Sequence, residues 1–81
     1  MADNSTTALE AKIAALSEEL SFVCHYYSKD PCQWRVALIA PKHNMPRVLT
    51  EFAKYGLHQV GDLAPAGDYV AGIFQTAQWR D

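Results

Sequence analysis

The chain has 81 residues, of which 49% are hydrophobic and 20% charged, and its formal net charge is -2. These values indicate one small globular domain and exclude a disordered chain. The lysines and arginines are scattered, which argues against nucleic acid as a partner, because phosphate binding needs a concentrated positive field. No apolar run approaches membrane-spanning length and no signal-peptide pattern occurs, so we expect a cytoplasmic protein without a membrane partner.

The first predicted element is a helix. Residues 1–5 are polar, and we expect a disordered tail there, followed by a single domain over residues 6–81. Thr7 and Glu10 have the spacing of a capping box, which predicts Thr7 as the helix N-cap. An apolar stripe with helical spacing follows, typical of a helix packed on a sheet. The stripe consists of Leu9, Ile13, Leu16 and Leu20.

Two predicted strands follow this helix. Residues 21–27, SFVCHYY, are rich in aromatic and β-branched side chains, and residues 33–40, QWRVALIA, are almost continuously apolar. The first composition predicts a strand, and the second predicts a strand in the centre of a sheet. The intervening residues 28–32, SKDPC, contain an Asp-Pro pair and predict the turn of a hairpin.

A second helix and a second pair of strands complete the chain. Asn44 is the predicted N-cap of this helix, and Gly56 stands where a C-cap needs a residue that accepts positive φ. Residues 57–63, LHQVGDL, predict a strand interrupted by a glycine, and residues 69–76, YVAGIFQT, predict the last strand after the turn APAGD. The buried stripe of the helix is predicted as Val48, Leu49, Phe52 and Ala53.

The order of elements is one helix-hairpin unit written twice. Val-Ala-x-Ile occurs at Val36–Ile39 and again at Val70–Ile73, 34 positions later. We expect these two strands to be the central pair of a four-stranded sheet with spatial order 1-2-4-3, and both helices to cover one face. The prediction is therefore an α+β fold, αββαββ, a two-layer sandwich of the ferredoxin-like type with its first strand moved to the end.

The other face of this sheet has no predicted cover. Side chains alternate across a strand, and the bulkier alternate set of the central strands suits the helix-covered side. The remaining set is more apolar than a solvated sheet face, and we expect a second copy of the chain, forming a homodimer, or another protein to cover it. A few small apolar residues left in water are the alternative. The predicted partner-binding residues are Tyr27, His25, Arg35, Ala37, Ile39, Tyr69, Ala71 and Ile73.

Residues 35–76 run strand, polar loop, helix, Gly-Leu, strand, turn, strand, with EFAKYGLHQVGDL at the centre. This pattern resembles the core of an ACT-type regulatory domain, in which a helix ends in a small and an apolar residue before a hairpin. The resemblance implies a module that binds an amino acid, a nucleotide or another small metabolite at a dimer interface, near His43, Asn44 and Met45.

The junction before the second helix is also a candidate anion site on physical grounds. Backbone amides at a helix N-terminus attract anions, and Lys42 adds a positive charge beside His43 and Asn44. A carboxylate or a phosphate would suit this chemistry. A capped helix beside a solvated lysine is the alternative.

The cysteines and histidines form no recognisable catalytic or metal motif. Seven residues separate Cys24 from Cys32, which is not a zinc-knuckle spacing, and no nucleophile elbow is present. The two cysteines flank a predicted turn, so a disulfide is conceivable, whereas two reduced thiols are typical of a cytosolic protein. We therefore expect no catalytic residues, no metal and no cofactor.

The functional expectation follows from these absences and from the uncovered face. It is a small, non-enzymatic binding protein that acts through protein–protein interaction, by its sheet face, an edge strand or exposed aromatic side chains. Inhibitors and adaptors belong to this class, including phage-encoded proteins that block host or defence machinery. The alternative is an ACT-like regulatory module with a small-molecule ligand.

Overall fold

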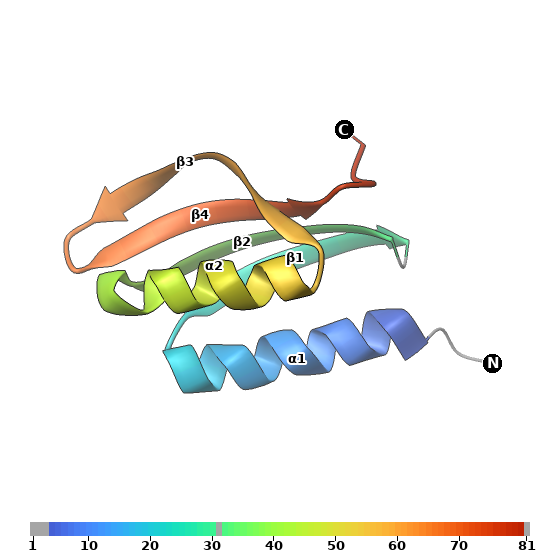
Figure 1. Ribbon diagram of the computed structural model, residues 1–81, viewed down its shortest axis with the longest axis horizontal. Coiled ribbons are helices and arrows are strands. Elements are labelled where there is room, and N and C mark those ends of the chain that lie inside the picture. The colour runs from blue at the N-terminus through green and yellow to red at the C-terminus, as the bar shows by residue number, and fades with distance from the viewer. Residues whose placement is uncertain (1–3, 31, 81) are drawn as a thin grey trace.

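The computed structural model describes the backbone of residues 4–30 and 32–80, and the side chains of residues 9–29 and 32–80. Its elements confirm the predicted order αββαββ (Figure 1). They are α1 (Asn4–Leu20), β1 (Val23–Asp30), β2 (Gln33–Pro41), the short 3-10 helix η1 (Lys42–Asn44), α2 (Met45–Lys54), β3 (Leu57–Ala66) and β4 (Tyr69–Thr76).

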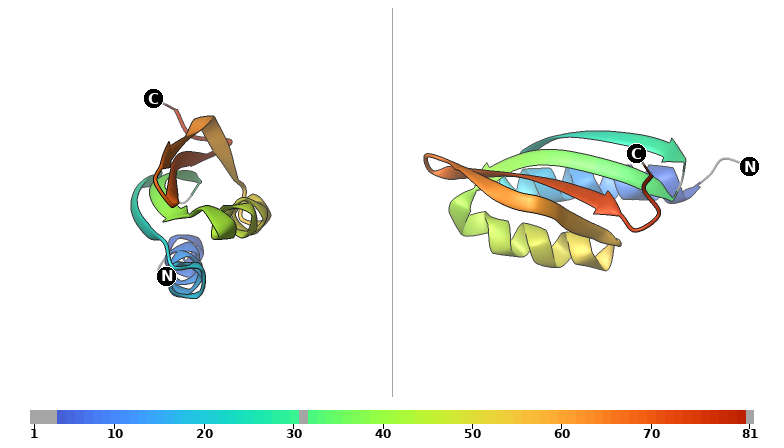
Figure 2. Two further views of the ribbon diagram at one scale, coloured as in Figure 1. Left: turned by 90° about the vertical axis from the view of Figure 1, so that its left-hand side faces the viewer. Right: turned by 90° about the horizontal axis from the view of Figure 1, so that it is seen from above.

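The four strands form one antiparallel sheet with the predicted order β1-β2-β4-β3. The two Val-Ala-x-Ile strands are its central pair, with Ala37 opposite Ile73 and Ile39 opposite Ala71. Both helices lie on the same side of the sheet, and the other side carries none of the described elements (Figure 2). The α+β class and the two-layer arrangement are thereby confirmed, while the likeness to ferredoxin-like proteins stays a prediction.

The first helix begins earlier than the capping box predicts. Since α1 starts at Asn4, Thr7 lies within the helix and the predicted N-cap is wrong. Asn, Ser and Thr follow one another from residue 4 to residue 7, and each is a favoured cap, so the sequence offers several starting points. Of the tail predicted over residues 1–5, residues 4 and 5 belong to α1, and residues 1–3 lie outside the described part of the chain.

The two helices end in the same way, which extends the internal repeat to the backbone. Ser21 follows α1 with a φ of 56° and Gly56 follows α2 with a φ of 78°, both in the left-handed region. Behind Ser21, the amide of Phe22 donates to the carbonyl of Ser17 over 3.1 Å, closing the helix end. In each case the next residue, Phe22 or Leu57, is buried and directs the chain into a strand.

A bulge in β3 bends one edge of the sheet. Val60 pairs with Ile73 and Ala64 with Ala71, so three residues of β3 lie opposite Gly72 alone. Gly61 supports the bend with a φ of 72°. Leu63 packs over Gly72, where an added Cβ would lie only 2.7 Å from Cδ2 of the leucine. A glycine at position 72 therefore leaves room for the bulged strand.

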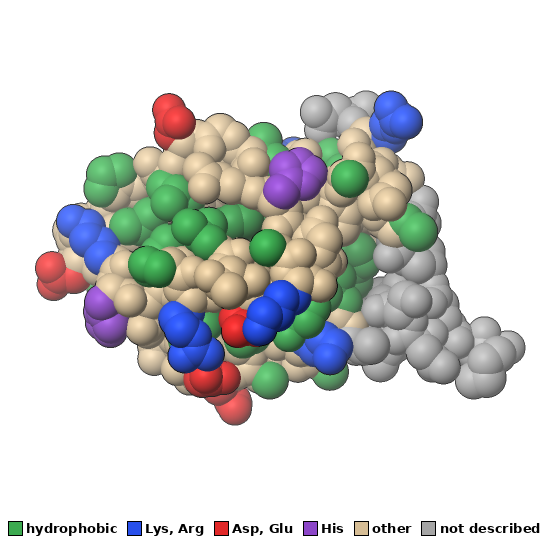
Figure 3. Space-filling model, viewed as in Figure 1, with side chains coloured by type: hydrophobic (Ala, Val, Ile, Leu, Met, Phe, Trp, Pro, Cys, Tyr) green, Lys and Arg blue, Asp and Glu red, His purple; other side chains and the backbone are tan. Residues whose placement is uncertain are grey.

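A hollow of about 450 Å³ lies between α2 and the start of β3. Hydrophobic side chains gather there on the face that Figure 3 shows. The predicted buried stripe of α2 is correct for Val48 and Phe52, but Leu49 is only half-buried and Ala53 is exposed. The stripe is narrower than predicted because Leu49 and Ala53 line this hollow.

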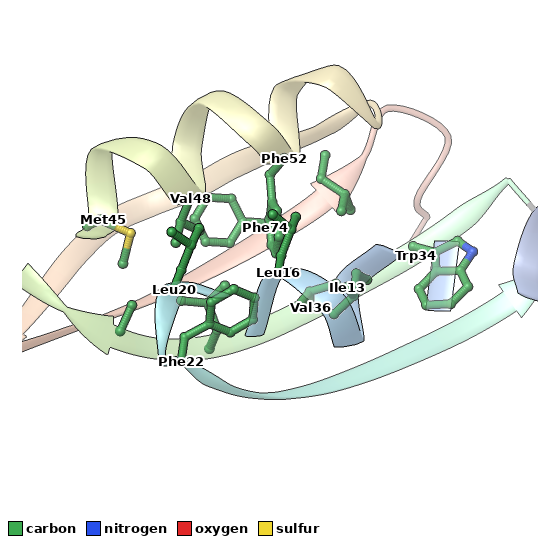
Figure 4. Close-up of a cluster of buried hydrophobic side chains, with 13 residues drawn as sticks. Ile13, Leu16, Leu20, Phe22, Trp34, Val36, Met45, Val48, Phe52 and Phe74 are labelled. Atoms are coloured by element: carbon green, nitrogen blue, oxygen red, sulfur yellow. The ribbon is translucent and has the colours of Figure 1, made fainter. Parts of the chain in front are cut away.

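The core lies between the helices and the sheet. The ring of Phe52 in α2 makes edge contacts with Phe22 and Phe74, at centroid distances of 6.0 and 5.1 Å (Figure 4). The predicted helix-facing residues of β2 and β4 are buried, with Val70 half-buried. The buried hydrophobic residues are Ile13, Leu16, Leu20, Phe22, Trp34, Val36, Leu38, Ala40, Met45, Val48, Phe52, Leu57 and Phe74.

Candidate functional site

The side of the sheet opposite the helices, called the open face below, carries all eight predicted partner-binding residues. Strand pairing places them in rows, because directly opposite residues of antiparallel strands point to the same side. One row runs from His25 through Ala37 to Ile73, and the next from Val23 through Ile39 to Ala71. Tyr27 and Arg35 form a pair towards the β1–β2 turn, and Tyr69 stands near the opposite end of the face.

The open face is low in its centre and raised at its rim. Large side chains at the rim are well exposed, with 68% of Val23, 61% of Tyr27 and 49% of Tyr69 accessible. The central strands instead carry two alanines and two half-buried isoleucines. This difference in side-chain height makes the face concave.

Three hollows adjoin one another across this concave centre. One of about 310 Å³ lies between Tyr69, Val23 and Ile39, and one of about 420 Å³ continues from Val23 and Ile39 to Ala37. A third, of about 220 Å³, extends from Ala37 to the bulge of β3. The predicted residues Ala37, Ile39, Ala71 and Ile73 line these hollows.

The C-terminal segment adds an aromatic residue that the sequence did not assign to this face. The ring of Trp79 makes an edge contact with Tyr27 at 5.8 Å between centroids, and the ammonium of Lys29 lies 4.5 Å from the Trp79 ring centroid. The amide of Arg80 donates to the side-chain oxygen of Gln33 over 3.1 Å. Trp79 is half-buried. Its place beside Tyr27 depends on these contacts and has no signal in the local sequence.

The aromatic residues of the β1–β2 hairpin divide between the two sides of the sheet. Trp34 is fully buried under the helices. Tyr26 points to the helix side, 44% of it is exposed, and its hydroxyl donates to the carboxylate of Glu10 over 2.9 Å. This hydrogen bond, with smaller contributions from burial and the nearby negative charge, raises the pKa of Tyr26. The amphipathic tyrosine therefore lies at the margin of the core, above Trp34.

The predicted anion site before α2 has a different arrangement. Lys42 and His43 are exposed in η1. The side-chain amide of Asn44 donates to the backbone carbonyl of Leu20 over 2.8 Å. The predicted N-cap position of Asn44 is confirmed, but its side chain makes no capping bond. The carbonyl at the end of α1 lacks a partner within its own helix, and it takes the Asn44 donor instead. None of the hollows described above is lined by these three residues.

Within the described residues, the cysteines and the potential metal ligands form no common site. Cys24 and Cys32 are reduced thiols rather than halves of a disulfide. Burial raises the pKa of the Cys24 thiol above its ordinary value. Among the side chains that the structure describes, no three potential metal ligands cluster. Neither α1 nor α2, as described, has the length and apolar character that a membrane-crossing helix needs.

The chain matches no protein-family model, and comparisons with curated proteins and with solved structures find no significant similarity. The resemblance of residues 35–76 to an ACT-type domain therefore stays a prediction, as does the small-molecule ligand that it implies.

Proposed function

We propose that the protein is a non-enzymatic binding module that docks on another protein through its open face. The observation that carries this proposal is the row of three adjoining hollows, with Ala37, Ile39, Ala71 and Ile73 among their lining residues. A contiguous, recessed apolar surface is typical of an interaction site rather than of scattered exposed side chains. Tyr27 and Tyr69 at its rim belong to the residue type that dominates binding energy in such sites.

The concave shape of the open face favours a different protein, rather than a second copy of the chain, as the binding partner. Two identical concave faces would meet only at their rims, where Val23 and Tyr27 of one copy would contact Val23 and Tyr27 of the other. The hollows between them would stay unfilled. Unfilled contacts lose dispersion energy, whereas a convex partner fills them. The apolar side of an amphipathic helix laid along β2 and β4 has the required shape. Arg35 and His25, both exposed on the open face, supply polar contacts at the edge of such an interface.

The test combines capture with direct binding. A partner captured from cells of the source organism would be purified and titrated against the wild-type chain and against Ala37→Arg and Ala71→Arg. Each arginine fills a hollow, and we expect the Kd to rise at least about tenfold, which corresponds to about 1.4 kcal/mol. Tyr27→Ala should weaken binding by about 2 kcal/mol or more if the tyrosine is a hot spot.

Two matched alanine-to-arginine variants serve as controls. Ala15 is exposed on α1, and Ala15→Arg should leave the Kd unchanged. Ala53 is exposed in the hollow between α2 and β3, so Ala53→Arg probes that surface. If Ala53→Arg weakens binding while Ala37→Arg and Ala71→Arg do not, the open face is not the docking surface.

A further inference from the structure

The charged side chains are divided unevenly between the two sides of the sheet. Every glutamate of the chain belongs to α1 or α2, the helices that cover one side (Figure 2). Within the described part of the chain, the ion pairs join Arg47 to Glu19 and Lys54 to Glu51, so both of them lie in the helix layer. The cations at one end of the open face have no acidic side chain paired with them in this way.

Three cationic residues, called the basic corner below, gather where the open face meets the β1–β2 turn. They are Lys29, Arg35 and Arg80. Arg35 lies opposite Tyr27, whose ring contacts Trp79. The ammonium of Lys29 lies over the Trp79 ring and donates to the backbone carbonyl of Arg80. Arg35 is exposed, and no described residue forms an ion pair with it. The described side chains of this corner are therefore positive, although the net charge of the chain is -2.

The basic corner adjoins the hollows of the open face at a spacing that suits a helix. Arg35, Ala37 and Ile39 are alternate residues of β2 on the same face, each about 7 Å from the next along the strand. An α-helix advances about 6 Å over four residues. A helix laid along β2 can therefore hold two apolar side chains over Ile39 and Ala37, and the next side chain of the same stripe over Arg35. A carboxylate is the group that complements a guanidinium there.

We propose that the partner of the open face is an acidic amphipathic helix, whose apolar stripe fills the hollows and ends in a glutamate or aspartate bound by Arg35. This inference rests on the proposed function and adds the chemistry of the partner to it. Lys29 and Arg80 extend the positive field to further carboxylates of the helix. A peptide is favoured over a nucleic acid, because phosphate contacts would engage the basic corner and leave the apolar hollows unfilled.

Two stapled helical peptides serve as probes. Both carry leucine at two stripe positions four residues apart, and the next stripe position holds glutamate in one peptide and lysine in the other. Titration of each peptide into isotope-labelled protein, followed by NMR, gives the Kd and maps the contacted surface. We expect the glutamate peptide to shift the amide signals of Ala37 and Ala71 and to bind about tenfold more tightly than the lysine peptide. Added salt should reduce this difference, because it screens exposed charges.

A charge reversal in the protein tests the role of Arg35 itself. Arg35→Glu should weaken binding of the glutamate peptide about tenfold and strengthen binding of the lysine peptide. Arg47→Glu is the matched control, because it changes the net charge by the same amount in the helix layer and should leave the preference unchanged. Both arginines are exposed, so both variants should fold. Equal effects of the two variants would assign the preference to net charge and overturn the role of Arg35.

The remaining outcomes separate this inference from the proposed function. Equal Kd values for the two peptides, with both of them shifting Ala37 and Ala71, would overturn the acidic partner and keep the open face as the docking surface. A glutamate peptide that leaves the open-face signals unchanged would also overturn the inference, while Ala37→Arg and Ala71→Arg with the captured partner decide the proposed function separately. Tighter binding of a single-stranded DNA of about ten nucleotides would assign the basic corner to nucleic acid instead.

Discussion

The single hydroxyl of Thr76 connects the end of β4 with the start of β2. Its Oγ1 accepts the backbone amide of Trp34 over 2.9 Å and donates to the carbonyl of Cys32 over 2.7 Å. The side chain is buried at the end of β4, where the bond to Trp34 is shielded from solvent. The start of β2 is thereby tied to the end of β4 in addition to the sheet ladder, and Trp34 is held in its fully buried position.

We expect Thr76→Val to destabilise the protein by about 1 to 3 kcal/mol, because the buried amide of Trp34 and the part-buried carbonyl of Cys32 lose their partner while the shape is kept. Urea unfolding measures the change. Thr50→Val is the matched control, since the Thr50 hydroxyl bonds to the carbonyl of Pro46 at an exposed position on α2. That variant should stay within about 0.5 kcal/mol of wild type. Equal effects of the two substitutions would contradict a structural role for the Thr76 hydroxyl.

At the scale of elements, the end of α1 and the start of α2 are connected by Asn44. Its amide nitrogen donates to the carbonyl of Leu20, which lies at the negative end of the α1 dipole. The salt bridge between Glu19 and Arg47 links the same two helices at the surface, over 2.9 Å. A donor is therefore required at position 44, whereas the N-cap role predicted from sequence requires an acceptor.

Asn44→Asp distinguishes these two roles. An aspartate is as good an N-cap as asparagine, so capping predicts little change or a small gain in stability. A carboxylate cannot donate to the Leu20 carbonyl and adds negative charge at the α1 C-terminus, so the observed contact predicts a loss of about 1 kcal/mol or more. Thermal unfolding at neutral pH decides the matter, with Asn44→Ala as the reference that lacks both a donor and a charge. An aspartate variant as stable as wild type would restore the capping role.

At the scale of the whole molecule, the two tryptophans mark its two sides. Trp34 lies in the core under the helices, and Trp79 lies half-buried against Tyr27 on the open face. Acrylamide, a neutral quencher, should therefore reach Trp79 and not Trp34. We expect Trp79→Phe to leave a blue-shifted emission with several-fold weaker quenching than wild type. Tyr27→Ala should increase quenching of the wild-type emission by uncovering Trp79. Strong quenching that persists in Trp79→Phe would show that Trp34 is not in the core.

The alternation of residues in the central strands was sufficient to predict the sheet and its two sides. Val36, Leu38 and Ala40 are buried as expected, and the eight residues assigned to the opposite side all lie there. A period of two is a local property of an extended chain, so it can be read without tertiary information. The repeat of Val-Ala-x-Ile likewise identified the central pair, because both strands need the same two-sided burial.

The depth of the open face, the hollow beside α2 and the location of Trp79 depended on the tertiary structure. The bulge of β3 arises where Leu63 packs over Gly72 of another strand. The side chain of Asn44 acts as a donor because the end of α1, 24 residues earlier in the chain, lies beside it. The C-terminal segment is held by Gln33, 47 residues away. Contacts between residues so distant in sequence leave no local pattern. Before folding, each group could form its hydrogen bonds with other partners, and only the fold brings these two together.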